Sequence, residues 1–355
     1  MGSSIPAAGK DKIILYHYPF SPYARRVTWY LRLRQIPYYE CIQPPILPRP
    51  DLTSLGISYR RIPLLSHNAS VYLDTRLILS HLESSPSLLS SGYKPLGSTP
   101  GTSAHGLQSL LSTLTTSTDI FFRAATLLPP NLPLMQDKNF LRDRRDFFPQ
   151  PGEKGEIVDY PLARAEALSA IRDVMHMLES TLLADGRDWI LGTETPSLAD
   201  VEAVWPLHWV LSAKQGIQGA IYDDEAVNPT KYPKVYGWVE RFEGYVFGLP
   251  DVVIGKLKGD EARKMILACE KEEEEDAAGT KYKVDGTEPV VKALELKKGE
   301  EVEVWPTDSG SSHRDKGKLV GIDGREVVWE SAGGVLVHAP RVGFRVGKGK
   351  VSGKL

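Results

Sequence analysis

The sequence predicts three parts of different fold class: an α/β domain, an all-α domain and a small all-β, barrel-like module. Residues 13–83 alternate strand-like and helix-like segments, and the patterning is helical from about Ser84 to Pro250. An acidic run then precedes several short strands at turn-like spacing. A chain of 355 residues, of which 41% are hydrophobic, is long enough for two or three domains.

The α/β part begins with a short buried strand at 13–16, followed by a loop and a helix. The helix begins at Ser21-Pro22, since serine caps free amides and proline suits the first helical position. A second strand is predicted at 38–42, and the proline-rich run QPPILPRPDL after it cannot be helical. Ser21 is explained by helix capping alone, and a chemical role needs support from the rest of the chain.

Residues 62–66 and 71–73 are predicted to form an antiparallel hairpin, with a tight turn at 67–69 and a helix after it. Pro63 is unusual in such a strand because proline cannot donate to the ladder. Two interpretations stay open. Pro63 is either a trans proline that opens the strand, or part of a cis Ile62-Pro63 bond that leaves the backbone of Ile62 available to a ligand.

The middle part carries apolar stripes at helical spacing, which are most simply explained as core. Ser197 and Asp200 form a capping-box pattern at the start of the run SLADVEAVWPLHW, and Pro206 is expected to end or kink that helix. The segment Ser84 to Gly106 is rich in Ser, Gly and Pro and is typical of a linker.

The C-terminal part is predicted to be a small barrel or sandwich whose strands are KALEL, EEVEVWP, GKLVGI, EVVWES, VLVHAP and GFRVG. Trp305 and Trp329 lie in separate strands and are candidates to pack together in a core of their own. The basic run GKGKVSG at the end is interpreted as a frayed tail, because no helix follows it to bind a phosphate. We therefore expect this module to fold independently.

These patterns set the predicted domain boundaries. The α/β domain covers 11–84, the linker 85–106, the helical domain 107–269, the acidic hinge 270–280 and the β module 281–350.

Composition excludes several function classes. Lys and Arg number 43 against 45 Asp and Glu, so the net charge of -2 provides no basic field for nucleic acid or an anionic membrane. The only two cysteines, Cys41 and Cys269, lie far apart, which suits a reducing compartment, and neither they nor the 8 histidines have metal-ligand spacing. No apolar stretch reaches membrane-spanning length, and the N-terminus lacks a signal-peptide pattern. We expect a cytoplasmic protein without metal, nucleic acid or membrane partners.

Four separated stretches resemble the glutathione transferase superfamily. They are SPYARRV after the first strand, RRIPLL around Pro63, LDTRLILSHLE after the hairpin, and YPKVYGWVERF with Pro250 beyond it. Their order over about 13–250 implies a thioredoxin-like N-terminal domain followed by a helical domain, in a serine-type or omega-like member. The C-terminal β module is additional to this resemblance.

The resemblance implies glutathione as co-substrate or cofactor and assigns roles to particular residues. Ser21 takes the place of the catalytic hydroxyl or cysteine. At the positive end of a helix, a hydroxyl donor would lower the pKa of the thiol, which is about 8.5 when unperturbed. The tripeptide backbone would pair with Ile62 beside Pro63, and its γ-glutamyl end with Asp74 and Thr75. The family more often has Glu or Gln followed by Ser at the last two positions.

The resemblance leaves the cation for the glycyl carboxylate open. Arg61 is nearest in the sequence, and Arg49 or Arg60 could replace it. Tyr16 and Tyr18 flank the Ser21 turn as rival hydroxyls, although ordinary packing is the favoured interpretation for both.

An apolar electrophile pocket is expected between the two domains. Its candidate residues are Tyr18, Phe20, Tyr23, Phe121 and Phe122. A homodimer is also implied, as is usual for this superfamily.

Three functions follow from these residues. The first is a transferase that activates the glutathione thiol for attack on a small hydrophobic electrophile. The second is a glutathione-dependent cis-trans isomerase of a conjugated olefin, which returns free glutathione. The third is a non-catalytic binding or scaffold protein, an idea that the extra β module favours because small barrels often bind peptides or nucleic acid.

Overall fold

The computed structural model describes residues 11–147, 160–212, 220–222, 224–270 and 282–349. These residues form two compact units. The helical unit contains Phe20–Ile36 and Leu82–Asp251, and the sheet unit contains the described residues of Ser4–Pro19, Pro37–His81 and Val252–Leu355.

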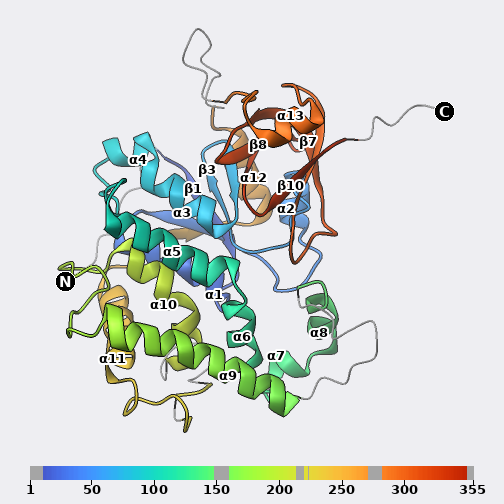
Figure 1. Ribbon diagram of the computed structural model, residues 1–355. Helices are drawn as coiled ribbons and strands as arrows, with labels where there is room; N and C mark the ends of the chain where they lie inside the picture. Colours follow the sequence, from blue (N-terminus) through green and yellow to red (C-terminus); the bar gives the residue numbers. More distant parts are fainter. Residues whose placement is uncertain (1–10, 148–159, 213–219, 223, 271–281, 350–355) are drawn as a thin grey trace. The chain divides into compact units, whose positions relative to one another are not determined.

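The sheet unit is built on a 10-stranded sheet (Figure 1). Its strands are β1 (Ile13–His17), β2 (Tyr38–Ile42), β3 (Leu64–His67), β4 (Ser70–Leu73), β5 (Val253–Lys256), β6 (Glu301–Pro306), β7 (Asp315–Ile322), β8 (Glu326–Ser331), β9 (Leu336–Pro340) and β10 (Phe344–Lys348). They lie in the order β10-β6-β7-β8-β9-β4-β3-β1-β2-β5.

The N-terminal strands pair as a mixed sheet. β1 is parallel to β2 and antiparallel to β3, with Leu15 opposite both Glu40 and Leu65. The predicted hairpin is formed by β3 and β4, and Asn68 in its turn has a left-handed φ of 53°. This is a backbone region that Asn tolerates better than most residues. The N-terminal part therefore has the expected thioredoxin-like strand arrangement.

The C-terminal strands continue the same sheet. β9 runs parallel to β4, with Val71 opposite Val337, and the orange and red strands of Figure 1 lie beside the blue ones. The two sets also share one hydrophobic core, in which Leu55 and Leu64 are buried together with Val304 and Trp329. The expected β module at 281–350 thus shares its sheet and its core with residues 37–81.

Four helices accompany the sheet: α2 (Pro50–Ser54), α3 (Thr75–Ser84), α12 (Gly259–Leu267) and α13 (Pro289–Leu294). The run KALEL was expected to be a strand, and this expectation was wrong, because most of it belongs to α13. Proline in the first turn of α13 favours a helix start, and Glu295 ends the helix with a left-handed φ of 50°.

Residues 253–267 also differ from the predicted boundaries. The sequence placed them at the end of the helical domain, but they form β5 and α12 of the sheet unit. β5 pairs in parallel with β2, so the chain returns to the edge of the N-terminal sheet after the helical unit.

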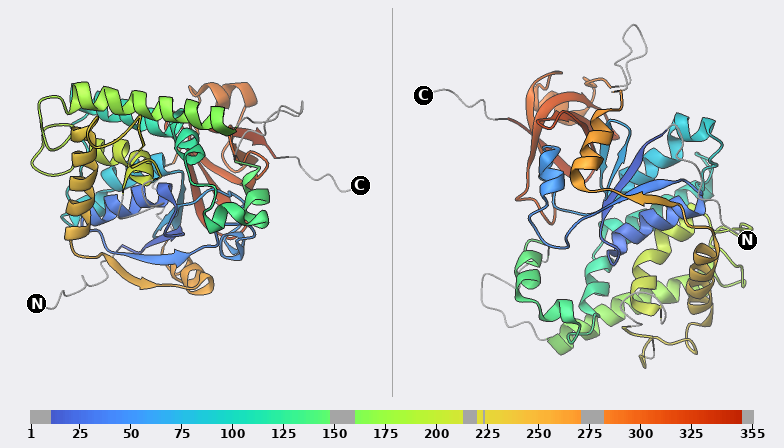
Figure 2. Two further views of the ribbon diagram at one scale, coloured as in Figure 1. Left: turned by 90° about the horizontal axis from the view of Figure 1, so that it is seen from below. Right: turned by 180° about the vertical axis from the view of Figure 1, so that it is seen from behind.

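The helical unit consists, within the described residues, of α1 (Pro22–Leu33), α4 (Pro86–Ser90), α5 (Ser103–Ser117), α6 (Ile120–Thr126), α7 (Pro133–Gln136), α8 (Lys138–Arg144), α9 (Tyr160–Met177), the π-helical turn η1 (Leu178–Leu182), α10 (Leu198–Leu211) and α11 (Pro233–Gly248). The expected linker at 85–106 contains α4 and the start of α5. The long helix α9, green in Figure 2, packs beside α6.

Helix α10 is buried along its whole length and is central to the helical unit. Its start is the predicted capping box, in which the Ser197 amide donates to Asp200 Oδ2 at 2.9 Å. Asp200 Oδ1 also accepts from the indole of Trp238 at 2.9 Å, which ties α11 to α10. The helix continues past Pro206 to Leu211, so the proline does not end it.

Two expectations concern residues outside the described ranges. Most of the acidic hinge at 270–280 and most of the glycine-rich C-terminal run lie outside them. None of the helices in the described ranges is long and apolar enough to cross a membrane.

Candidate functional site

Ser21 lies at the junction of β1 and α1. It is the N-cap of α1, with extended backbone angles, and its Oγ accepts a hydrogen bond from the Ala24 amide at 3.3 Å. Pro22 follows as the first helical residue. The capping interpretation is therefore confirmed, yet it uses the side chain only as an acceptor. The Ser21 side chain is 3% exposed, and its hydroxyl hydrogen makes no bond to the described residues, so the donor site of the hydroxyl is unused by them.

The peptide bond between Ile62 and Pro63 is cis, which settles the alternative that the sequence left open. β3 begins one residue after the proline. Within the described residues, neither the N–H nor the C=O of Ile62 makes a hydrogen bond. These groups are therefore available to pair with an extended peptide backbone.

Asp74 directly follows β4 and has a left-handed φ of 66°, an unusual conformation for a non-glycine residue. Its carboxylate accepts from the backbone N–H, Nε and Nη2 of Arg76 at 2.9 to 3.0 Å. Burial by itself would raise the pKa of Asp74, but Arg76 and, less strongly, Arg61 hold it below its ordinary value. The carboxylate is therefore ionised and already paired, while Thr75 beside it is buried.

Arg61 is the most exposed of the three arginines considered for the glycyl carboxylate, since Arg49 and Arg60 are both buried. Arg49 donates to backbone carbonyls, including that of Pro44 at 3.1 Å. Arg61 Nε donates to the Ser309 carbonyl at 2.9 Å, and its Nη2 contacts the same carbonyl and the Asp308 carboxylate. Its Nη1 makes no hydrogen bond to the described residues.

Three of the expected electrophile-pocket residues lie together in the helical unit. The ring of Phe121 is 4.8 Å from that of Tyr23 and 5.3 Å from that of Phe122. The sequence analysis missed two further members, Trp205 and Trp209 of α10, whose rings lie 4.5 Å from Tyr23 and 5.6 Å from Phe121. Every residue of α10 is buried, and apolar residues of such a helix resemble plain core in sequence, so nothing distinguished these two residues.

The other aromatic candidates behave differently. Phe20 is 43% exposed, and Tyr18 is half-buried in the sheet unit. Tyr16 is completely buried, and burial raises the pKa of its hydroxyl well above the ordinary value. It is therefore a poor donor for an incoming anion, and Ser21 remains the better candidate.

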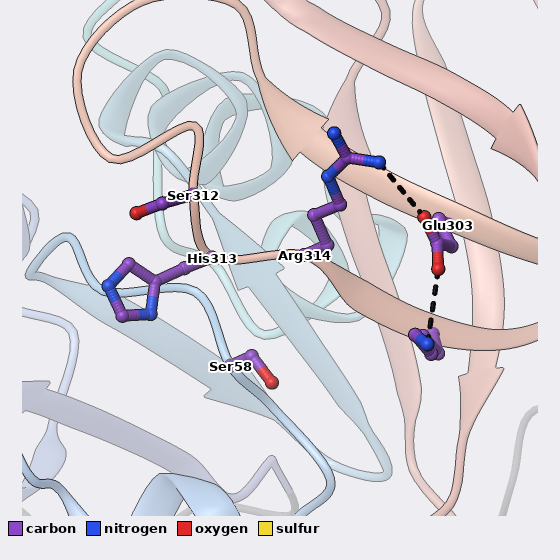
Figure 3. A pocket seen from close by; sticks show the side chains of 6 residues that line it. Ser58, Glu303, Ser312, His313 and Arg314 are labelled. Carbon is purple, nitrogen blue, oxygen red and sulfur yellow. Dashed lines mark hydrogen bonds and ion pairs between the residues drawn. The ribbon is translucent and has the colours of Figure 1, made fainter.

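The sheet unit also contains an open cavity of about 440 Å³ that sequence analysis did not detect. It is lined by Ser58, Glu303, Ser312, His313, Arg314 and Lys316. Figure 3 shows Arg314 turned towards Glu303, which it contacts at 3.2 Å. Hydrogen bonds from Lys316 and Arg314 lower the pKa of Glu303. In the part of the chain that the structure describes, no group of three or more His, Cys, Asp or Glu could hold a metal.

Comparison with known proteins identifies the N-terminal domain. Residues 15–89 match the family model of the glutathione S-transferase N-terminal domain. Residues 15–89 are thus similar to the N-terminal domain of glutathione S-transferases. Residues 123–248 match a second model, described as a domain of unknown function (DUF7962). No curated protein matches the chain at a significant level.

Solved structures share the fold. A GST-like protein from Pseudomonas syringae has a TM-score of 0.62 and 23% identity, and the match covers 95% of this chain and 99% of that one. This coverage is too large to omit the C-terminal strands, so they too belong to a known fold.

Other similar structures match less of the chain. The tau class glutathione S-transferase MiGSTU from mango has a TM-score of 0.46 and 16% identity, with coverage of 68% and 94%. Rice GST1, solved in complex with glutathione, has a TM-score of 0.46 and 16% identity, with coverage of 73% and 96%. The family match at 15–89 supports a glutathione transferase type of function in broad terms.

Proposed function

We propose that this protein is a glutathione transferase-like enzyme that activates the thiol of glutathione for attack on a small hydrophobic electrophile. The observation that carries this proposal is the geometry of Ser21. Its hydroxyl accepts from the first turn of α1, and its hydrogen, unused by the described residues, would be donated to the thiolate. The N-terminus of a helix favours negative charge, so a thiolate there would receive both a hydrogen bond and the helix dipole.

The energetic requirement is modest. A thiol with a pKa of about 8.5 is only a few per cent ionised at pH 7. Lowering that pKa by about two units converts most of the thiol to thiolate at pH 7. This shift corresponds to a stabilisation of the thiolate by about 2.7 kcal/mol. One charge-assisted hydrogen bond and the dipole at a helix N-terminus together contribute a stabilising free energy of this magnitude.

The sheet unit supports the binding of the rest of the tripeptide. The unused N–H and C=O of Ile62 would pair with the cysteinyl backbone as an added strand. The ionised Asp74 would attract the α-ammonium group of the γ-glutamyl residue. The Nη1 group of Arg61 would be the donor to a carboxylate.

The aromatic cluster formed by Tyr23, Phe121, Phe122, Trp205 and Trp209 supports an apolar second substrate. The half-buried rings of Tyr23, Phe121 and Phe122 would stack on an aromatic or conjugated electrophile and keep water from the thiolate. The buried Trp205 and Trp209 would pack behind them.

A non-catalytic glutathione-binding protein is the second candidate. It is favoured by the environment of Ser21, which is 3% exposed and whose presence is explained by the capping of α1 alone. In this case glutathione would bind without turnover.

Two measurements with the full chain test these proposals. Calorimetric titration with glutathione measures binding, and mass spectrometry of the products with 1-chloro-2,4-dinitrobenzene measures conjugation. A conjugate supports the transferase, and binding without product supports the binding protein. The absence of glutathione binding at millimolar concentration would overturn both.

A further inference from the structure

We propose that the connection between β6 and β7 positions the backbone of residues 58–61 for glutathione binding, with Asp315 as the main positioning residue. This inference rests on the proposed function. Residues 58–61 belong to no helix or strand, and they lead directly into Ile62 and its cis bond to Pro63. A segment that lacks the regular backbone hydrogen bonds of a helix or a sheet depends on contacts with other parts of the protein for its position.

Asp315 makes the most direct contact. It is the first residue of β7, it is 2% exposed, and its Oδ1 accepts from the amides of Ser58 at 2.5 Å and Tyr59 at 3.3 Å. Two consecutive amides bonded to one carboxyl oxygen fix the direction of the chain at this point. The acceptor comes from a residue 257 positions away, so the C-terminal part of the sequence determines the course of this N-terminal segment.

The other end of the same connection contacts Arg61. The Asp308 carboxylate and the Ser309 carbonyl both accept from its guanidinium group. Gly310 lies against Arg60 so closely that an added Cβ would be 3.1 Å from the Arg60 Cγ. The connection between β6 and β7 therefore contacts residues 58–61 at both ends.

Two further features agree with this arrangement. The ring of Tyr59 packs on Phe344 at the start of β10, at a centroid distance of 5.7 Å. Figure 3 shows Ser58 on one side of the cavity and Ser312 and His313 of the connection on the other.

The positioning by Asp315 is expected to affect the affinity for glutathione rather than the rate of the chemical step. A ligand that pairs with the backbone of Ile62 loses affinity if that backbone must first be ordered. A backbone held in place before binding avoids this cost. Asp315 touches neither the thiol nor the reacting atoms, so its removal should weaken glutathione binding while leaving the saturated rate nearly unchanged.

The test compares three variants of the full chain. Asp315→Ala removes the acceptor, Asp315→Asn keeps an oxygen acceptor without the charge, and Asp323→Ala is the matched control. Asp323 Oδ1 also accepts from two consecutive amides, those of Arg325 and Glu326 at 2.7 and 2.9 Å, but in the turn between β7 and β8.

We expect Asp315→Ala to raise the Kd and KM for glutathione by at least about tenfold, with a change of less than about twofold in kcat. Asp315→Asn should retain most of the affinity, and Asp323→Ala should have the wild-type Kd. Hydrogen exchange should accelerate at residues 58–62 in Asp315→Ala alone. A purely structural role would instead change stability in both alanine variants and leave the Kd of each folded protein the same.

A second variant and the hydrogen exchange measurement cover the case in which Asp315→Ala does not fold. If Asp315→Ala does not fold, Asp308→Ala replaces it, because that side chain is 62% exposed and still contacts Arg61. Equal exchange at residues 58–62 in the wild type and the variant would overturn the proposed positioning. Failure of the wild type to bind glutathione would overturn the proposed function, while the exchange experiment still shows whether these residues are held by Asp315.

Discussion

At the scale of single residues, Ser21 combines two roles that sequence analysis treated as alternatives. Its oxygen caps α1 through the Ala24 amide, and its hydrogen is unused by the described residues. A serine hydroxyl has one donor and two acceptor sites, so capping and thiolate stabilisation do not compete. A cap at this position is thus compatible with chemistry.

We expect Ser21→Ala to reduce kcat/KM for glutathione conjugation by about 10²-fold or more, because the thiolate loses its donor. The pKa of bound glutathione, measured from thiolate absorbance against pH, should rise towards about 8.5. The loss of the cap should cost only about 1 kcal/mol of stability.

Thr102→Ala is the matched control for the lost cap. Thr102 caps α5 by accepting from the His105 amide at 3.2 Å, so its removal has a similar effect on a helix start without touching Ser21. Unchanged turnover in Ser21→Ala would assign the chemistry to another group.

The site residues also show the limit of sequence reasoning. The sequence identified Asp74 and Arg61 as polar candidates, and both lie in the sheet unit with ionic partners. The ionic partners of these two residues differ in their distance along the sequence. Arg76 is two residues from Asp74, whereas Asp308 is 247 residues from Arg61, and no local pattern signals a pairing over that distance.

At the scale of elements, local rules predicted most of the N-terminal part. The turn at Asn68, the cap at Ser21 and the capping box at Ser197 all came from short-range chemistry. The pairing of β9 with β4 could not be predicted in this way, because which strand covers a sheet edge depends on the whole fold. Helix α13 was missed because its apolar residues also suit a short strand.

The turn between β8 and β9 illustrates how closely distant elements approach. An added Cβ on Gly333 would lie 2.3 Å from the backbone carbon of Leu55, just after α2. Ser331, the last residue of β8, donates to the Leu55 carbonyl at 2.6 Å. We expect Gly333→Ala to lower the free energy of unfolding by roughly 1–3 kcal/mol, because backbone cannot move aside as a side chain can.

Urea unfolding of the sheet unit would measure this effect. Gly324→Ala is the matched control, since Gly324 lies in the neighbouring turn and an added Cβ there would meet nothing within 4 Å. Equal stability of the two variants would contradict the close packing described here.

At the scale of the whole molecule, Asp315 links stability to pH. Burial raises its pKa from 3.8 to about 7, although the amides of Ser58 and Tyr59 act in the opposite direction. Between about pH 4 and pH 7 the folded protein therefore holds a proton that the unfolded chain has released. Stability contributed by this group is present at low pH and is lost as the pH rises through that window.

We expect Asp315→Asn, which cannot titrate, to gain stability relative to the wild type by on the order of 1–4 kcal/mol between pH 4.5 and pH 8. Urea unfolding of both proteins at several pH values gives this difference, in which the contributions of all other carboxyl groups cancel. A constant difference across the range would mean that the folded carboxyl group titrates normally.

The largest consequence of the fold concerns the C-terminal strands. From sequence they were expected to fold alone, but β9 covers the edge of β4, and Trp329 and Val304 are buried in the same core as Leu55. Deletion of the residues after Asp276 would uncover that edge and remove part of the core. Each large buried side chain that is lost or newly exposed costs about 1.5–3 kcal/mol, and typical domains have only about 5–15 kcal/mol to lose.

We therefore expect the truncated chain to lose cooperative unfolding of the sheet unit and to aggregate through the bare edge of β4. Circular dichroism during urea unfolding and light scattering would measure both changes. The control is deletion of the residues after Gly349 alone, which leaves all ten strands of the described sheet intact. A truncated protein that stays monodisperse and unfolds at the urea midpoint of the full chain would contradict a shared core.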